Sequence, residues 1–406
     1  MKSNYRYIVK AFMAMAVIAG TTSCDDFLDR EPMSSISPET YYSTAAQLEA
    51  NLNDEYPNVL PSFGQWTYGI FGEDKGTDNQ IEVNANDRYT QDRWKVPHSE
   101  SDNWKFERIY RINFFLSEAL PKFGEDMSGS QNTISGSVAT IKHYIGEMYF
   151  LRAYEYFKKL QLFGDFPIID QPLADEMEAL REASKRFPRN EVARFIISDL
   201  DKAYAYMSDV DMATTRINKD AAMLVKSRVA LFEATWLQNF KGTAFVPGGE
   251  GWPGASLHNN YQYPSGNLDN EVKYFLEQAV EASKLVADKY KGNLTENTGV
   301  LQQSADDPSN PYFDMFAQED LSDVKEVLLW RQYARGLSTH NINAAAGRGN
   351  YRIGLTRGFV QNFLMKDGTP VYAHGSYADG DGYYMGDKTV ADVLVNRSEE
   401  RRVGKE

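Results

Sequence analysis

Side chains that can bind a sugar occur in two stretches that are rich in glycine and show no helical period, residues 57–100 and 240–267. Flat aromatic rings stack on the apolar faces of pyranose rings, and planar polar groups bond to their hydroxyls. The aromatic candidates are Trp66, Tyr68, Trp94, Trp252 and Tyr263. The polar candidates near the first group are Asp78, Asn79, Arg88 and Arg93. We expect these residues to bind ligand, and packing of a loop on a helix is the alternative for each tryptophan.

Residue types that are typical of catalytic or metal centres are scattered along the sequence. The five histidines, none of which has a close metal-ligand partner in the sequence, are His98, His143, His258, His340 and His374. The sequence shows no nucleophile elbow and no glycine loop that would hold phosphate. Three carboxylates hint at calcium, although their spacing departs from the EF-hand pattern: Asp379, Asp381 and Asp387. We therefore predict no catalytic residue, no cofactor and no metal ion.

The N-terminus has the features of a lipoprotein signal peptide, which we predict over residues 1–23. Three basic residues precede a ten-residue apolar run that is too short to span a bilayer. Cys24 is the only cysteine, and it stands at the expected cleavage point after small residues, so we expect it to be lipidated. Thr21 departs from the usual leucine of a bacterial lipobox, and an unlipidated secreted protein is the alternative. Asp25 and Asp26 resemble the acidic signal for export to the outer face of the outer membrane.

The composition and charge narrow the classes of partner. Apolar residues make up 42% of the chain and charged residues 25%, which is ordinary for a globular protein. The formal net charge is −14. Such a field repels polyphosphates, so we expect no nucleic-acid partner.

The longest helical pattern runs through residues 137–169. Apolar side chains recur at helical spacing on two sides of this segment, so we expect an inner helix of an all-α array. Gly146 and Ala153 share one of these sides, where small side chains let a neighbouring helix approach closely. Gly164 is expected to end the helix, and Pro167 to prevent its resumption.

Further helices are predicted around this segment. One begins with Ser37 as its cap and ends at Pro57, and one begins after Asn218 as its cap. The others cover residues 104–120, 190–207 and 270–290. In the last of these the spacing places Glu271 on the outer, polar side. Residues 326–333, EVLLWRQY, are predicted to form a short strand.

These elements predict a mainly α fold. Helix pairs separated by long loops suggest hairpins like those of tetratricopeptide repeats, although the repeat is degenerate in sequence. The helical framework is expected over about residues 37–290. The loop-rich part, which contains short strands and the ligand residues, is expected over residues 57–100, 240–267 and 291–396.

The last ten residues, RSEERRVGKE, match one reading frame of a widely used sequencing adapter. We therefore expect residues 397–406 to be an artefact. The natural protein is expected to continue beyond Asn396, so that the C-terminal part of the domain over residues 24–396 is missing.

Several motifs, taken in order along the chain, resemble the SusD/RagB family of surface glycan-binding lipoproteins from Bacteroidetes. They begin with CDDFLD at Cys24 and WKFERIYRIN at Trp104. GEMYFLRAYEYFKKLQLFGDFPI, FPRNEVARFIISDLDKAY and RINKDAAMLVKSRVALFEATW follow, and LTRGFVQNFLMKDGTPVY is the last. Each motif is weak singly, but their joint order is specific.

The resemblance implies a function without catalysis. It implies a helical domain of four tetratricopeptide-like hairpins that docks on a SusC-like TonB-dependent barrel, and a loop-rich half that binds an oligosaccharide or polysaccharide. The protein would capture the glycan and close over the transporter as a lid, with a lipid as its membrane anchor. Two other hypotheses remain, a helical glycoside hydrolase that uses a pair of carboxylates and a protein-interaction scaffold.

Overall fold

Helices make up most of the structure, a computed structural model that describes residues 41–63, 74–82, 103–124, 126–208, 212–300, 306–333, 339, 353–356, 358–359 and 362. The α-helices within these residues are α3 (Ala45–Val59), α4 (Glu107–Phe123), α5 (Val138–Phe163), α6 (Met177–Ala183), α7 (Arg189–Tyr206), α8 (Lys219–Asn239), α9 (Leu268–Tyr290) and α10 (Pro311–Met315). A 3-10 helix (Pro253–Ser256) and two strands, β1 (Gln80–Glu82) and β2 (Ile353–Leu355), are the other regular elements of the described ranges. The predicted mainly α fold is confirmed.

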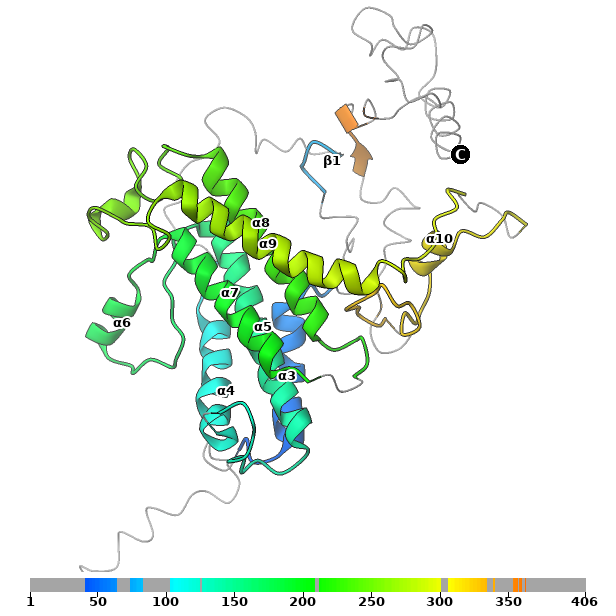
Figure 1. Cartoon of the computed structure of the whole chain (residues 1–406), viewed down its shortest axis with the longest axis horizontal. Coiled ribbons are helices and arrows are strands. Elements are labelled where there is room, and N and C mark those ends of the chain that lie inside the picture. Colours follow the sequence, from blue (N-terminus) through cyan, green and yellow to red (C-terminus); the bar gives the residue numbers. More distant parts are fainter. Residues whose placement is uncertain are drawn as a thin grey trace, which may run out of the picture.

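Helix α5 lies at the centre of the helical array, where α3, α4 and α7 all pack against it (Figure 1). The hydroxyl of Ser137 accepts the N–H of Thr140 and caps the start of the helix. Gly164 follows the last residue of α5 with a φ of 67°, a conformation that glycine adopts at little cost. Because α5 carries buried residues on all of its sides, the prediction of an inner helix is confirmed.

Gly146 lets α7 come close to α5, as its position in the pattern predicts. A Cβ atom on Gly146 would lie 2.8 Å from the backbone nitrogen of Met207 and 3.0 Å from the carbonyl oxygen of Ala203. Both atoms belong to backbone, which cannot move aside as a flexible side chain can. Ala153, farther along α5, is fully buried as well.

Helices α7, α8 and α9 continue the array: α7 packs on α5, α8 on α7 and α9 on α8 (Figure 1). The side chain of Asn218 accepts the N–H of Ala221 and caps α8, as predicted. Asn267 caps α9 in the same way. Within the described part of the chain, the helices are all too short or too polar to cross a membrane.

The helix predicted to begin at Ser37 has a different start. Helix α3 begins at Ala45, because Thr44 and Gln47 form a reciprocal capping box. Tyr42 has a φ of 58° and breaks any continuous helix from further upstream. The helix also includes Pro57 in its last turn, whereas the sequence predicted an end there.

The strand predicted over residues 326–333 is not formed. This segment crosses the start of α8, where the indole Nε1 of Trp330 donates to the hydroxyl of Thr214 at 2.9 Å. Asn218 donates to the carbonyl of Leu328 at 2.6 Å, and Trp330 N–H donates to Thr214 O at 3.2 Å. Its backbone groups therefore bond to a helix end and a loop, and not to a neighbouring strand.

Strands β1 and β2 pair antiparallel, with Gln80 opposite Leu355 and Glu82 opposite Ile353. The pairing joins residues from the first loop-rich stretch to residues near the end of the chain. Thr356 extends it, since its N–H donates to the carbonyl of Asn79 at 2.9 Å. The prediction that the loop-rich part contains short strands is therefore confirmed, although at a different place.

Candidate functional site

The loop that joins α8 to α9, residues 240–267, covers the end of α5 and the start of α7. A cavity of 560 Å³ lies beneath this loop, which is within the range of about 300–1,000 Å³ that is usual for small-molecule sites. Its walls combine aromatic rings with charged groups. The side chains that matter for its chemistry are Trp236, Phe245, Trp252, Asp165, Arg186 and Arg189.

Asp165 joins three segments at one wall of the cavity. It directly follows Gly164 at the end of α5, and its Oδ1 accepts the backbone N–H of Arg189 at the start of α7 at 2.9 Å. Its Oδ2 accepts the indole N–H of Trp252 in the loop at 2.7 Å. Burial raises the pKa of Asp165, although these hydrogen bonds favour its charged form.

Trp252 was predicted to bind ligand, and it lines the cavity. Only 5% of its surface is exposed, however, and its ring packs beside His258 and Tyr261 with centroid distances of 6.0 and 5.6 Å. His258 in turn contacts the carbonyl of Arg186 through its Nε2 at 2.8 Å. Trp252 therefore performs the loop-to-helix packing that was the alternative for each tryptophan, while one edge of it contributes to the cavity wall.

Tyr263, the other ligand candidate in this loop, is half-buried and does not line the cavity. Its hydroxyl donates to the carbonyl of Pro247 at 2.5 Å, and its ring contacts that of Tyr261 at 5.1 Å. Burial raises the pKa of Tyr263. In the described structure, this side chain stabilises the fold of the loop.

Arg189 is the central charged group of the cavity, and sequence reasoning missed it. Its Nε and Nη2 both donate to the carboxylate of Glu233 on α8, at distances of 2.9 to 3.1 Å. Its guanidinium lies 4.1 Å from the ring centroid of Trp236. Arg189 is 3% exposed and Glu233 is fully buried, and burial raises the pKa of Glu233 despite the nearby guanidinium.

A second arginine–glutamate pair joins α7 to the start of α9, and Ser265 at the end of the loop bonds to both members of the pair. Arg194 donates through Nε and Nη2 to Glu271, at 2.7 and 2.9 Å, and Asn190 donates to the same carboxylate at 3.0 Å. Burial acts to raise the pKa of Glu271, but the bonds from Arg194, Asn190 and Ser265 outweigh it and hold the pKa below its ordinary value. The prediction that Glu271 faces outward is wrong, because the loop covers this end of α9.

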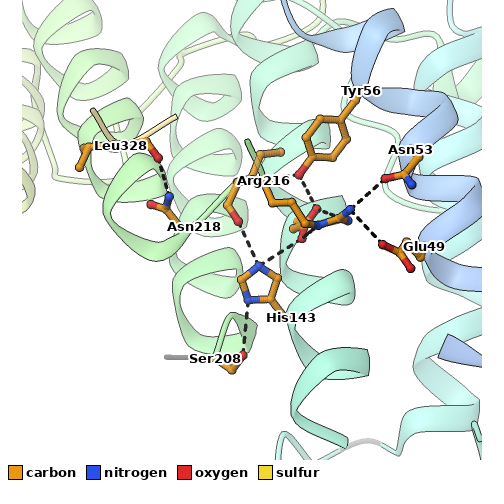
Figure 2. Close-up of polar contacts among 10 residues, drawn as sticks. Glu49, Asn53, Tyr56, His143, Ser208, Arg216, Asn218 and Leu328 are labelled. Atoms are coloured by element: carbon orange, nitrogen blue, oxygen red, sulfur yellow. Dashed lines mark hydrogen bonds and ion pairs between the residues drawn. The ribbon is translucent and has the colours of Figure 1, made fainter. Parts of the chain in front are cut away.

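A further polar cluster lies inside the helical array, between α3, α5 and the segment before α8 (Figure 2). Arg216 donates to both oxygens of the fully buried Glu147 at 3.0 and 2.9 Å, and its Nη1 donates to Asn53 at 2.9 Å. His143 contacts Glu147 Oε1 at 3.1 Å and the carbonyl of Ile217 at 3.0 Å. Every nitrogen of this guanidinium has a partner within the cluster, so the cluster joins helices.

The two ends of the first loop-rich stretch are held by neighbouring lysines of α5. Lys158 donates to the carbonyl of Val59 at 2.8 Å, and Lys159 donates to that of Asn103 at 2.8 Å. The buried Glu155 lies 2.7 and 3.3 Å from the two ammonium groups. One turn of α5 therefore fixes both points where this stretch leaves the helical array.

Two of the polar candidates can be placed. Asp78 is exposed and Asn79 is half-buried in the turn before β1, and both carbonyls accept hydrogen bonds from Thr356. They are not among the residues that line the cavity. The other predicted site residues lie outside the described residues: Cys24, Trp66, Tyr68, Arg88, Arg93, Trp94, Asp379, Asp381 and Asp387.

The groups in the cavity are arranged for binding. Glu233 is enclosed in its pair with Arg189, and both oxygens of Asp165 accept hydrogen bonds, so neither carboxylate is presented as an unengaged base. Among the described residues, no group of three or more His, Cys, Asp or Glu side chains could hold a metal ion. The missed residues had one signal in the sequence: Asp165 follows the glycine that ends one helix, and Arg189 follows the proline before the next.

Comparisons with known proteins agree with this architecture. A SusD-like family model, described as "Starch-binding associating with outer membrane", matches residues 26–231. A curated relative, SusD-like protein P2 from Formosa agariphila, is 25% identical over 253 residues, which are 59% of this chain and 46% of the relative. The chain spans 41 to 46% of the length of the curated relatives that it matches.

Two solved structures have similar folds. A SusD-like carbohydrate binding protein from Bacteroides fragilis has a TM-score of 0.52 and 14% identity, and the match covers 83% of this chain and 57% of that chain. A second SusD-like protein from Bacteroides fragilis has a TM-score of 0.53 and 20% identity, with 87% of this chain and 58% of that chain covered. At these identities the likeness concerns the fold.

Proposed function

The chain belongs to the SusD-like family, and on that premise we propose that it is a surface-exposed lipoprotein that binds a glycan and acts as the lid of a SusC-like TonB-dependent transporter. The observation that carries the proposal is the family match over residues 26–231, because it spans the helical array from before α3 into α8. Lipidation at Cys24 would provide the membrane anchor at the outer membrane.

We propose different roles for the helical array and for the loop-rich stretches. The helical array is the part that docks on the transporter, and the loop-rich stretches present the ligand residues. Trp66, Tyr68, Arg88, Arg93 and Trp94 remain proposed sugar contacts of the first stretch. The cavity beneath residues 240–267 is the proposed contact of the second.

One observation favours the alternative of a glycoside hydrolase. Asp165 faces a cavity and has a raised pKa, as the proton donor of a glycosidase does. Its oxygens, however, accept hydrogen bonds from Trp252 and from the backbone of Arg189, and Glu233 is fully buried. A hydrolase needs two carboxyl groups that reach the scissile bond from opposite sides, so this arrangement supports binding.

Glycan binding is tested by the retardation of the purified full-length protein in native gels that contain a polysaccharide. We expect retardation in a panel of such gels, and its loss in Trp66→Ala and Trp94→Ala. Tyr110→Ala is the control, because Tyr110 is an exposed aromatic residue of α4 in the helical array, outside the loop-rich stretches, and its substitution should leave retardation unchanged. Release of reducing ends from the polysaccharide would instead show a hydrolase, and a lack of retardation in every gel would favour a protein scaffold.

The anchor is tested separately in cells. Radiolabelled palmitate should enter the wild-type protein, and the Cys24→Ser variant should remain unlabelled and detach from the outer membrane. Labelling of the variant would place the lipid elsewhere and contradict this part of the proposal.

A further inference from the structure

We infer that the cavity beneath residues 240–267 binds the carboxylate of an acidic sugar unit, with Arg189 and Arg186 as the donors. The inference rests on the proposed function, since it names the class of glycan that this site would take. Three features of the cavity support it, namely an unpaired donor on Arg189, the engaged acceptors that surround this donor, and the residues at the mouth.

The unpaired donor is the third nitrogen of Arg189. Its Nε and Nη2 donate to Glu233, but Nη1 has no hydrogen-bond partner among the described residues, although Arg189 is only 3% exposed. This nitrogen faces the cavity beside Gly164, where an added Cβ would lie 3.5 Å from it. Because Nη1 is open to the cavity and is not sealed from solvent, a ligand with an acceptor can reach it and bond to it.

Two other arginines, the buried Arg152 and the partly buried Arg216, have a protein partner at each guanidinium nitrogen. Arg152 donates through Nε and Nη2 to Asp199, and its Nη1 donates to Asn113 at 2.9 Å. Arg216 uses its Nη1 on Asn53. Arg189 also donates to its carboxylate through Nε and Nη2, but its Nη1 faces a cavity where the other two arginines have an acceptor.

The acceptors around this nitrogen are already engaged. Asp165 accepts from Trp252 and Arg189, and Glu233 accepts both prongs of Arg189. Asp165 keeps unused lone pairs, but the two guanidinium groups that line the cavity, those of Arg186 and Arg189, supply donors without an acceptor among the described residues. A carboxylate supplies only acceptors and matches the planar fork of an arginine, so an acidic sugar fits these donors better than a neutral one.

The mouth of the cavity adds a second cation and an apolar surface. Arg186 lines the cavity and is exposed, and its guanidinium lies 4.6 Å from the ring centroid of Trp104. This stacking holds the group in place and leaves its N–H donors directed away from the ring, where a ligand can accept from them. Phe245 and Leu257 border the same opening and are 62% and 53% exposed. They provide the apolar surface that the face of a sugar ring needs.

The test compares acidic glycans with their own neutral forms. Polygalacturonate, alginate and glucuronoxylan are each offered to the full-length protein, beside the same polymers after reduction of their carboxyl groups to alcohols. We expect at least one acidic polymer to bind, with an affinity about tenfold above that of its reduced form and lower at high salt.

Single substitutions test which side chains bind the carboxylate of the acidic polymer. Arg186→Gln should lose about tenfold in affinity for the acidic polymer, because a planar charged donor is removed from an exposed position. Lys185→Gln is the matched control, since it makes the same charge change one residue away, at a side chain that does not line the cavity. Arg189→Lys keeps a positive charge beside Glu233 but removes Nη1, and should also weaken binding. Thermal melting of each variant checks that it is folded.

The outcomes separate the inference from the proposed function. If neutral glycans bind and none of the acidic polymers does, or if Arg186→Gln and Lys185→Gln bind equally well, the inference is wrong and the proposed function stands. If the protein binds no glycan of either kind, both are wrong.

Discussion

Two arginine–glutamate pairs occupy different regions of this protein and have different surroundings. Inside the helical array, Arg216 binds both oxygens of Glu147 and spends its remaining nitrogen on Asn53 (Figure 2). At the end of the array, Arg189 binds Glu233 in the same two-pronged way, but its remaining nitrogen borders a cavity. A satisfied pair stabilises the packing of helices. A pair that keeps an unpaired donor at a cavity can also donate to a ligand, as we propose for Arg189.

The largest expected effect on stability comes from Arg152, whose ion pair with Asp199 leaves no guanidinium nitrogen without a partner and is the most deeply buried pair of this kind. Arg152 is 3% exposed, and the carboxylate of its partner Asp199 is fully buried. Arg152→Leu leaves that carboxylate without its partner, so we expect the free energy of unfolding to fall by about 3–5 kcal/mol. Urea unfolding followed by circular dichroism measures the change.

The control for this prediction is another cation beside Asp199. Lys202 lies 3.6 Å from Asp199, but its side chain is 42% exposed. Lys202→Met should change the free energy of unfolding by less than about 0.5 kcal/mol. Equal losses in the free energy of unfolding for the two variants would contradict this prediction. They would show that burial of an ion pair does not determine how much it stabilises the protein.

Substitution of Gly146 is expected to have the next largest effect on the free energy of unfolding. It tests the packing of α7 on α5, which involves no charged group at this position. Gly146→Ala places a methyl group 2.8 Å from the backbone nitrogen of Met207, so α7 has to move away from α5. We expect a loss of about 1–3 kcal/mol in the free energy of unfolding. Gly292→Ala is the matched control, because nothing lies within 4 Å of the Cβ that it adds. A stable Gly146→Ala variant would show that the contact between α5 and α7 can relax.

The pH dependence of stability distinguishes the two glutamates that lie at the ends of the 240–267 loop. The pKa of Glu271 is lowered in the folded protein from an ordinary value of 4.5, so its contribution is present above that pH and is lost as the pH falls through the folded pKa. The pKa of Glu233 is raised, so its contribution is complete below its ordinary pKa and is lost as the pH rises through the folded value. The two carboxyl groups therefore change the stability of the protein in opposite directions as the pH falls.

Melting temperatures between pH 3 and pH 7 should accordingly respond in opposite ways in the two glutamine variants. Glu271→Gln should flatten the loss of stability on the acid side of 4.5, the ordinary pKa of this group. Glu233→Gln should reduce the gain in stability that Glu233 gives the wild type as the pH falls from neutrality toward that value. The slope with pH is the readout, because either substitution also changes the overall stability. Parallel curves for the two variants would contradict the assigned directions.

The sequence predicted the helical array well where local spacing decides the structure. Both ends of α5, the close approach at Gly146 and the cap at Asn218 follow from residues that are neighbours along the chain. The helix predicted from Ser37 to Pro57 is not continuous, because α3 begins only at Ala45, after the capping box of Thr44 and Gln47, and Ser37 itself lies outside the described residues. The mainly helical fold could be predicted from the sequence because helical periodicity depends on residues that are close together along the chain.

The cavity was much less predictable, because contacts between distant segments build it. Helical spacing placed Glu271 on the polar side of its helix, and nothing local shows that the loop before it folds back over that side. Trp252 was predicted to bind ligand and does line the cavity, but Arg189, one of its charged groups, pairs across 44 residues with Glu233. Such a pair leaves no periodic trace in a single sequence.

The smallest expected effect concerns Lys158, which tests whether a satisfied charge in the last turns of α5, outside the cavity wall, also matters for the cavity. Its ammonium group donates to the carbonyl of Val59 and lies 2.7 Å from Glu155, but the side chain is 34% exposed, so water can replace both partners. Lys158→Met should therefore cost only about 0.5–1 kcal/mol in the free energy of unfolding. Affinity for the acidic polymer should stay unchanged, because Lys158 does not line the cavity. A loss of affinity as large as that of Arg186→Gln would mean that the glycan reaches the base of the first loop-rich stretch, and the donors of the cavity would then not be the main source of specificity.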